Sequence, residues 1–99
     1  MATAKSKAAD FNSVLDRFGQ YVLLEMGRSP NTVKAYTKDI ETMFAFAQER
    51  GCSELSDIGI MELRGWLAGQ RTQGLSSATL ARRATAVRTF FAWATSQQH

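Results

Sequence analysis

Two groups of hydroxyl, amide and cationic side chains stand near the starts of two expected helices, and their types suit the binding of an anion. The groups are Asn31, Thr32, Lys34 and Lys38, and Ser77, Thr79, Arg82 and Arg83. Helix starts expose unpaired backbone N–H groups, and Lys or Arg one turn further on adds positive charge. Short polar side chains reach phosphate oxygens without bulk, and Thr or Asn also contacts base edges. We therefore expect these two helix starts to bind DNA.

Ordinary solvated helix faces would carry the same residue types. Residue types alone support a DNA-binding surface and a solvated helix face equally. Arg83 and Arg88 individually fit ion partners within the domain better than ligand contacts. A choice between binding surface and solvated face therefore needs evidence beyond residue type.

Residues for catalysis are scarce in this chain. The only histidine is His99, at the last position, and the only cysteine is Cys52, which we expect to be an inert thiol. One His and one Cys cannot build a zinc site, and no glycine-rich loop follows a strand. The nine carboxylates, Asp39 among them, are expected on polar faces. We expect no catalytic residue, no cofactor and no metal.

Length and charge describe one small, mildly basic domain. The 99 residues carry a net charge of +3, and 44% of them are hydrophobic, enough for one core. No acid follows Glu62, so the last expected helix is purely cationic. No stretch approaches the ~18 apolar residues that span a bilayer, and a lone cysteine suits a reducing compartment. We expect a cytoplasmic protein with a polyanionic partner and no membrane segment.

Apolar spacing and capping residues predict an all-α fold of four helices. The first follows Asp10 as N-cap and ends at Gly27, the second follows Ser29-Pro30 and ends near Gly51. The third covers about 60–72, with a poor cap, and the fourth follows Ser76 to about 94. Residues 1–9 are expected to be a disordered lead, 10–96 the domain, and 97–99 a frayed tail.

The apolar stripe of the fourth helix sets which of its residues should face outward. Leu80, Ala84, Val87, Phe91 and Ala94 recur at helical spacing, with Phe90 at the edge of the stripe. Thr79, Arg82 and Ala86 then fall on the other side, with Arg83 on the boundary. The pattern predicts that Phe91 is central to the core and that Ala86 is outside it.

Two stretches resemble the paired motifs of the core-binding domain of tyrosine recombinases, and the Xer type is the most similar. The first motif is Gly27-Arg28-Ser29-Pro30-Asn31-Thr32-Val33-Lys34-Ala35-Tyr36 with Asp39 and Phe44. The second is Gly74-Leu75-Ser76, Thr79-Leu80-Ala81-Arg82-Arg83, Ala86-Val87-Arg88 and Phe90-Phe91-Trp93. Gly59-Ile60 departs from the Thr-Pro start that is common for the third helix.

The resemblance implies a compact four-helix, SAM-like domain that forms one half of a clamp around duplex DNA. The catalytic half, with the nucleophilic tyrosine, would be absent, so this chain alone would be no enzyme. Implied partners are a double-stranded recombination site and other recombinase protomers, which form a tetramer on DNA, while the isolated chain would be monomeric or weakly dimeric. Implied groove contacts are Asn31, Thr32, Ala35, Ser77, Thr79 and Arg82, and implied phosphate contacts are Lys34, Lys38 and Arg83.

The expected function is therefore a non-catalytic DNA-binding domain of a recombinase that resolves chromosome dimers at cell division. A phage or transposon integrase domain is an alternative with the same mechanism. A helical protein–protein adaptor is the alternative from another class, and it predicts an exposed apolar patch around Phe90, Phe91 and Trp93. The recombinase versions also predict some exposed apolar surface at the C-terminal end.

Overall fold

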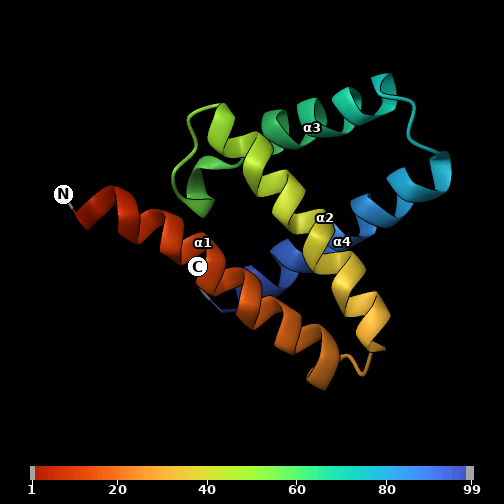
Figure 1. The fold of residues 1–99 in the computed structure, drawn as a ribbon, viewed down its shortest axis with the longest axis horizontal. Helices are drawn as coiled ribbons and strands as arrows, with labels where there is room; N and C mark the ends of the chain where they lie inside the picture. The colour runs from red at the N-terminus through yellow and green to blue at the C-terminus, as the bar shows by residue number, and fades with distance from the viewer. Residues whose placement is uncertain (1, 98–99) are drawn as a thin grey trace.

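The computed structural model describes residues 2–97, with side chains from residue 11 onward. Within that range the chain forms four α-helices and no strand: α1 Ala2–Gln20, α2 Pro30–Glu49, α3 Ile60–Thr72 and α4 Ser77–Ser96 (Figure 1). A π-helical turn, Tyr21–Glu25, extends α1, and a 3-10 turn, Leu55–Asp57, precedes α3. The all-α, four-helix prediction is confirmed, while the expected frayed tail extends beyond the described residues.

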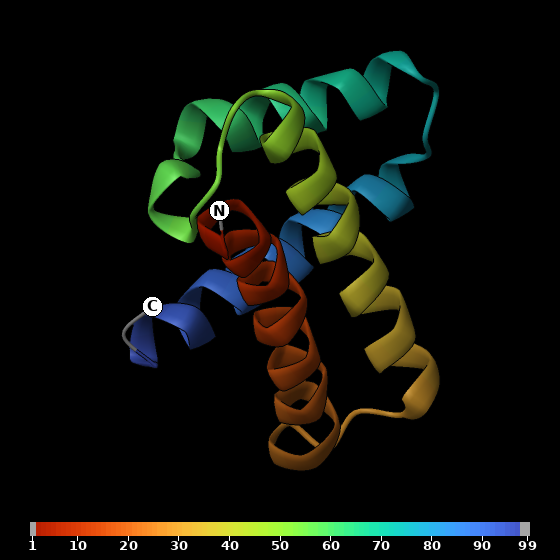
Figure 2. The ribbon, with the colours of Figure 1, turned by 60° about the vertical axis from the view of Figure 1, so that its left-hand side comes forward.

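The α2 helix lies at the centre of the arrangement. It packs along α1 on one side and crosses α4 on another, and α3 contacts both α2 and α4 (Figures 1 and 2). Phe18 of α1, Ile40 of α2 and Phe90 of α4 are each 0% exposed, so the core lies where these three helices meet. The Phe18 and Phe90 rings meet edge to face at 5.2 Å. The Phe44 ring of α2 meets Phe90 in the same way at 5.5 Å, so packing of apolar rings contributes to the α2–α4 crossing.

The first helix begins earlier than its capping residue predicts. Because α1 starts at Ala2, Asp10 lies inside the helix and does not cap it. The stretch before Asp10 is rich in alanine and lysine, which favour helix strongly enough to continue it backward. At the other end, Gly27, where the first helix is expected to end, adopts the left-handed conformation with φ of 66°. The bounds of 1–9, 10–96 and 97–99 for lead, domain and tail stay predictions.

The buried face of α4 differs from the predicted stripe. Ala86 and Phe90 are fully buried, and Phe91 is only partly buried, so the expectations for these three residues were wrong. The small Ala86 side chain is packed into the interior, and the larger rings of Phe90 and Trp93 are buried beside it. Trp93 is buried as well, so the apolar patch that the adaptor alternative predicts around Phe90, Phe91 and Trp93 is not exposed.

Exposed apolar side chains gather elsewhere among the described residues. The large ones are Leu23, Leu24, Ile60 and Met61. They lie in the π-helical turn and at the start of α3, and none of them is at the C-terminal end, where the recombinase interpretation predicted apolar exposure. No described helix combines the length and apolar character that crossing a membrane requires.

The α3 helix has the predicted bounds in spite of its poor cap. Gly59 has no side chain to accept a hydrogen bond, and the Glu62 carboxylate instead accepts one from the Gly59 backbone N–H at 2.8 Å. A carboxylate in the first turn also interacts favourably with the helix dipole. Ile58 is buried ahead of it. The α3 helix contacts both α2 and α4 and lies across the C-terminal half of α2 (Figure 2).

Candidate nucleic-acid interface

The α2 and α4 helices begin with the same hydrogen-bonded cap. The Ser29 hydroxyl accepts from the Thr32 backbone N–H at 3.2 Å, and the Ser76 hydroxyl accepts from the Thr79 N–H at 3.1 Å. Each serine hydroxyl also donates to the threonine hydroxyl three residues on, at 3.1 and 3.0 Å respectively. Since a hydroxyl has one proton and two acceptor lone pairs, Thr32 and Thr79 each keep their own proton for an outside acceptor.

The two starts also differ in how many backbone donors they leave open. In α2, Pro30 has no N–H and the Val33 N–H bonds to Ser29, so Asn31 retains the open donor of the first turn. In α4, the capped and bonded residues are Thr79 and Leu80, which leaves the N–H groups of residues 77 and 78. Both starts can therefore receive an anion, and that of α4 offers more backbone donors.

A buried carboxylate links α2 to α4 where they cross. Asp39 is 0% exposed and accepts hydrogen bonds from Arg82 Nε at 3.0 Å and Arg82 Nη2 at 2.8 Å. Arg83 Nε donates to the same carboxylate at 3.1 Å. The expectation that Asp39 lies on a polar face was therefore wrong. A charge with two guanidinium partners can stay buried because its acceptor sites are occupied.

The two arginines at this link have different surroundings. The Arg83 side chain is 16% exposed and also donates from Nη1 to the Gln70 Oε1 of α3. The Arg82 side chain is 43% exposed, and its hydrogen bonds to Asp39 raise its pKa above the ordinary arginine value. Arg83 is thus committed to the interior, as its residue-level interpretation as an ion partner suggested. Arg82 is anchored at one edge and open to solvent at the other.

The polar chain continues into α3 and ends on unpaired donors. Gln70 is 5% exposed, and its Nε2 has no hydrogen-bond partner among the described residues. The same holds for the indole Nε1 of Trp66, one turn earlier on α3. Buried donors of this kind are normally satisfied by an internal water. Because Arg83 donates to Gln70, the link between α2 and α4 extends to α3, so that three helices share one polar cluster.

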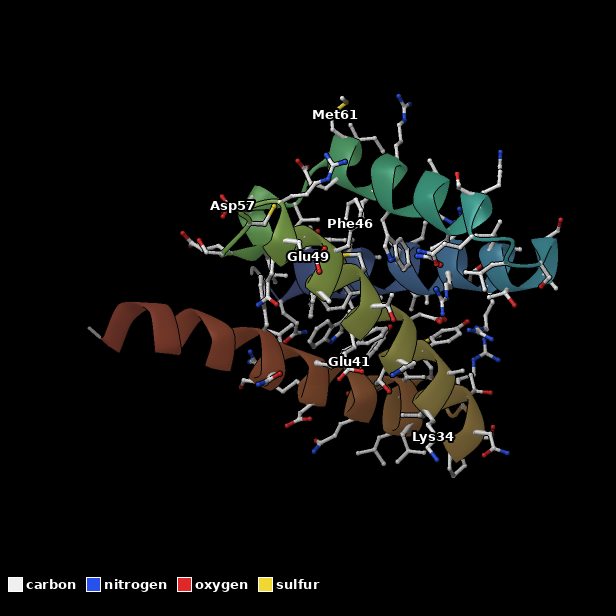
Figure 3. All side chains as sticks on the ribbon, turned by 45° about the horizontal axis from the view of Figure 1, so that its top comes forward. Lys34, Glu41, Phe46, Glu49, Asp57 and Met61 are labelled. Carbon is white, nitrogen blue, oxygen red and sulfur yellow. The ribbon has the colours of Figure 1, made fainter. Side chains whose placement is uncertain are left out.

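Helical geometry places the predicted residues of α2 on two sides. At about 100° per residue, Thr32 and Ala35 lie within about 40° of Asp39, on the side toward α4. Asn31 and Lys38 lie roughly a quarter-turn from Asp39 around the helix axis, on the exposed flank of α2. Lys34 lies further round still, and with Glu41 it projects from the side of α2 nearer α1 (Figure 3). The structure does not bring Lys34 together with Thr79 and Arg82.

The predicted residues of α4 divide in a similar way. Thr79 and Arg82 stand one turn apart on the side toward α2. Ser77 lies about half a turn away from Thr79, and it lines a groove of about 450 Å³ between α3 and α4 with Leu67, Arg71, Leu75, Leu80, Ala81 and Ala84. Thr79 and Arg82 therefore share a face with Thr32 and Ala35, and Ser77 does not.

The face shared by the two helices is V-shaped. Beyond the Asp39–Arg82 link, the N-terminal halves of α2 and α4 diverge on the same side of the crossing (Figures 1 and 2). We call residues 30–38 of α2 and 77–82 of α4 the V. The exposed Lys38 on its flank forms a loose surface pair with Glu41 at 3.7 Å, which leaves it able to turn to another anion.

Asp39 and Gln70 are the members of the cluster that residue-level reasoning missed. Asp39 had a signal in the sequence, since it stands three residues after Tyr36 and four before Met43, on the apolar stripe of its helix. A charged residue on such a stripe predicts a buried, paired group. Gln70 offers no comparable signal, because its role depends on how α3 packs against α4.

Comparisons with known proteins agree with the fold. The family described as "Phage integrase, N-terminal SAM-like domain" matches residues 15–98. The tyrosine recombinase XerC of Mycobacterium sp. (strain KMS) is 48% identical over 83 residues, which are 83% of this chain and 28% of that relative. The XerC proteins of Mycobacterium bovis (strain BCG / Pasteur 1173P2) and Mycobacterium tuberculosis (strain ATCC 25177 / H37Ra) are each 44% identical over 82 residues, which are 83% of this chain and 27% of each relative.

No solved structure matches the chain. The chain spans less than a third of the length of the curated relatives that it matches. The resemblance to tyrosine recombinases of the Xer type is confirmed by the family match together with these identities. The chain belongs to the phage integrase N-terminal SAM-like domain family, and it corresponds to the core-binding domain of a tyrosine recombinase.

Proposed function

We propose that the chain binds duplex DNA in the V, as the non-catalytic part of a longer tyrosine recombinase. The observation that carries this proposal is the Asp39–Arg82 link, which joins the two helix starts and leaves Arg82 partly exposed between them. A major groove about 12 Å wide admits a helix, and a guanidinium or threonine suits its base edges. The proposal places Thr32, Ala35, Thr79 and Arg82 at the groove.

Positive charge supports binding to phosphate around the V. Asp39 carries one negative charge against the two positive charges of Arg82 and Arg83, so the cluster keeps a surplus of one positive charge. Asn31 and Lys38 on the flank, and the open N–H groups at the start of α4, are placed as phosphate contacts. Lys34 and Ser77 point elsewhere, so we give them only peripheral contacts. We give Arg83 an internal role in place of the predicted phosphate contact.

The catalytic steps belong, in this proposal, to another part of the full-length protein. The relatives are named tyrosine recombinases, and the chain matches 28% of their length or less. We infer that the whole protein exchanges DNA strands with other protomers of a tetramer and resolves chromosome dimers. The shared helix starts fit a phage or transposon integrase equally well, but the identity to XerC favours the chromosomal role.

A threonine-to-valine pair tests the V directly. Thr32→Val with Thr79→Val removes two hydroxyls but keeps side-chain shape and the backbone N–H groups that bond the serine caps. The matched control is Thr42→Val with Thr95→Val, which removes hydroxyls from the same helices on the far side of the crossing. Fluorescence anisotropy at low salt would measure the affinity of wild type, test pair and control pair for a labelled duplex.

We expect the test pair to lower affinity about tenfold or more, because two contacts of about 1 kcal/mol each are lost. The control pair should bind like the wild type. Lys38→Ala should weaken binding to all duplexes alike and reduce the salt slope by about one. Absence of wild-type binding to any duplex, or equal losses in the two threonine pairs, would contradict the proposed surface.

A further inference from the structure

We propose that Asp39 is a positioning residue that gives the V its sequence discrimination while slightly opposing its affinity for DNA. This inference rests on the proposed function, because it concerns what Arg82 does once a duplex lies in the V. Nothing in the sequence motifs assigns this role to a residue that is 0% exposed. A buried carboxylate cannot contact DNA, so any influence must pass through Arg82.

The geometry of the link holds Arg82 in one orientation. Both carboxylate oxygens of Asp39 are engaged by Arg82, through Nε at 3.0 Å and Nη2 at 2.8 Å. This side-on, two-bond pairing fixes the guanidinium plane. Arg82 Nη1 has no partner among the described residues, and the side chain keeps 43% of its area exposed. The free edge of the guanidinium is therefore held at the floor of the V.

The carboxylate is itself kept in place from the other side. Arg83 donates to Asp39 Oδ1 at 3.1 Å and also to Gln70 of α3. Asp39 therefore cannot turn with Arg82, because a second arginine and a third helix hold it. Arg83 and Gln70 hold the carboxylate in place, and Arg82 is the arginine of the pair whose side chain is the more exposed to solvent.

Orientation and charge act in opposite directions on DNA binding. An arginine that reads a base pair needs its donors at fixed positions, and a fixed side chain loses less entropy when it binds. Contact with phosphate needs only positive charge, which a mobile arginine supplies equally well. The negative charge of Asp39 next to Arg82 weakens the attraction for any phosphate. Asp39 thus favours the correct sequence over other sequences without raising affinity for DNA in general.

The first test is Asp39→Asn, which keeps the side-chain volume and removes the charge. A duplex enriched by wild-type protein from a random pool, and the unselected pool itself, serve as probes in anisotropy titrations. We expect the affinity ratio between the two probes to fall about tenfold. Affinity for the unselected pool should stay equal or rise, with a salt slope steeper by about one, because one more positive charge is available.

A matched pair of substitutions covers the case in which Asp39→Asn does not fold. Arg82→Lys and Arg83→Lys make the same change in two neighbours that share the Asp39 carboxylate. Both keep the positive charge, but lysine lacks the planar fork. We expect Arg82→Lys to lower the affinity ratio between the selected and unselected probes about tenfold. Arg83→Lys should lower stability, since it loses the bond to Gln70. It should keep most of the ratio, because a lysine ammonium at this position still pairs with Asp39 and holds the carboxylate in place.

A measurement without DNA completes the design. Two-dimensional ¹⁵N spectra of arginine Nε–H groups should show slowly exchanging signals for Arg82 and Arg83 in the wild type. In Asp39→Asn, if it folds, the Arg82 signal should exchange rapidly. The inference is overturned if the variants at Asp39 and Arg82 keep the wild-type ratio, or if Arg83→Lys loses it to the same degree as Arg82→Lys. Failure of wild type to bind either probe would instead overturn the proposed function.

Discussion

Replacing Phe90 by alanine should remove about 4 kcal/mol from the free energy of unfolding, whereas the same change at Phe91 should remove only about 1–2 kcal/mol. Phe90 is 0% exposed, and its ring meets those of Phe18, Phe44, Phe91 and Trp93 at 5.0 to 5.9 Å. Phe91 is partly buried, and its neighbouring ring is that of Phe90. The difference follows from which of two adjacent phenylalanines faces the α2–α4 crossing.

Urea unfolding monitored by far-ultraviolet circular dichroism would measure both values. A domain of this length has about 5–15 kcal/mol of stability, so Phe90→Ala leaves a marginal protein whose midpoint falls by about 2–3 M. If Phe90→Ala does not fold, Phe90→Leu against Phe91→Leu gives the same comparison with smaller losses. Equal costs at the two positions, or a larger cost at Phe91, would contradict the orientation of α4, in which Phe90 and not Phe91 faces the core.

Three further predictions concern local features of the chain. Gly27→Ala should lower the free energy of unfolding by about 1–2 kcal/mol, whereas Gly69→Ala should raise it by about 0.5–1 kcal/mol, as measured by thermal melts. An added methyl group would touch nothing within 4 Å at either position, but of the two glycines only Gly27 has a positive φ. Higher stability in both variants would disprove the left-handed turn at Gly27. Ser29→Ala and Ser76→Ala should each cost about 1 kcal/mol, since each serine caps its helix in the same way, and unequal costs would contradict equivalent caps. Burial, and to a smaller extent the nearby acids Glu62 and Asp57, raises the pKa of the Cys52 thiol. A disulfide reagent should therefore label the native protein far more slowly than the urea-unfolded protein at pH 8. Equal labelling rates would show that the thiol is accessible in the native protein.

Most helix boundaries were predictable because they depend on a few neighbouring residues. Ser29-Pro30 and Ser76 start α2 and α4 where the sequence predicts, and Gly74 follows α3 with φ of 88°. These signals act within one turn, so tertiary packing does not alter them. The start of α1 was missed because an alanine-rich stretch continues the helix through a residue that would otherwise cap it.

The candidate site was predictable only in part, because its geometry depends on packing between helices. The caps with Thr32 and Thr79 are local, and they appear as expected. The packing of the core rings determines which face of α4 meets α2. As a result Arg83 points to the interior, and Ser77 lines the groove between α3 and α4 instead of the V. The pairing of Asp39 with residues 43 and 44 positions later is a long-range contact that no local pattern encodes.

Binding of DNA in the V can be observed residue by residue in a titration of ¹⁵N-labelled protein with duplex DNA, followed by amide and arginine side-chain chemical shifts. We expect the largest changes in the V, at the amides of Thr32, Ala35 and Thr79 and at the Arg82 Nε–H group. If the changes were confined to α1 or to residues 52–59, with the V unaffected, DNA would bind elsewhere on the chain and the V would not be the binding surface.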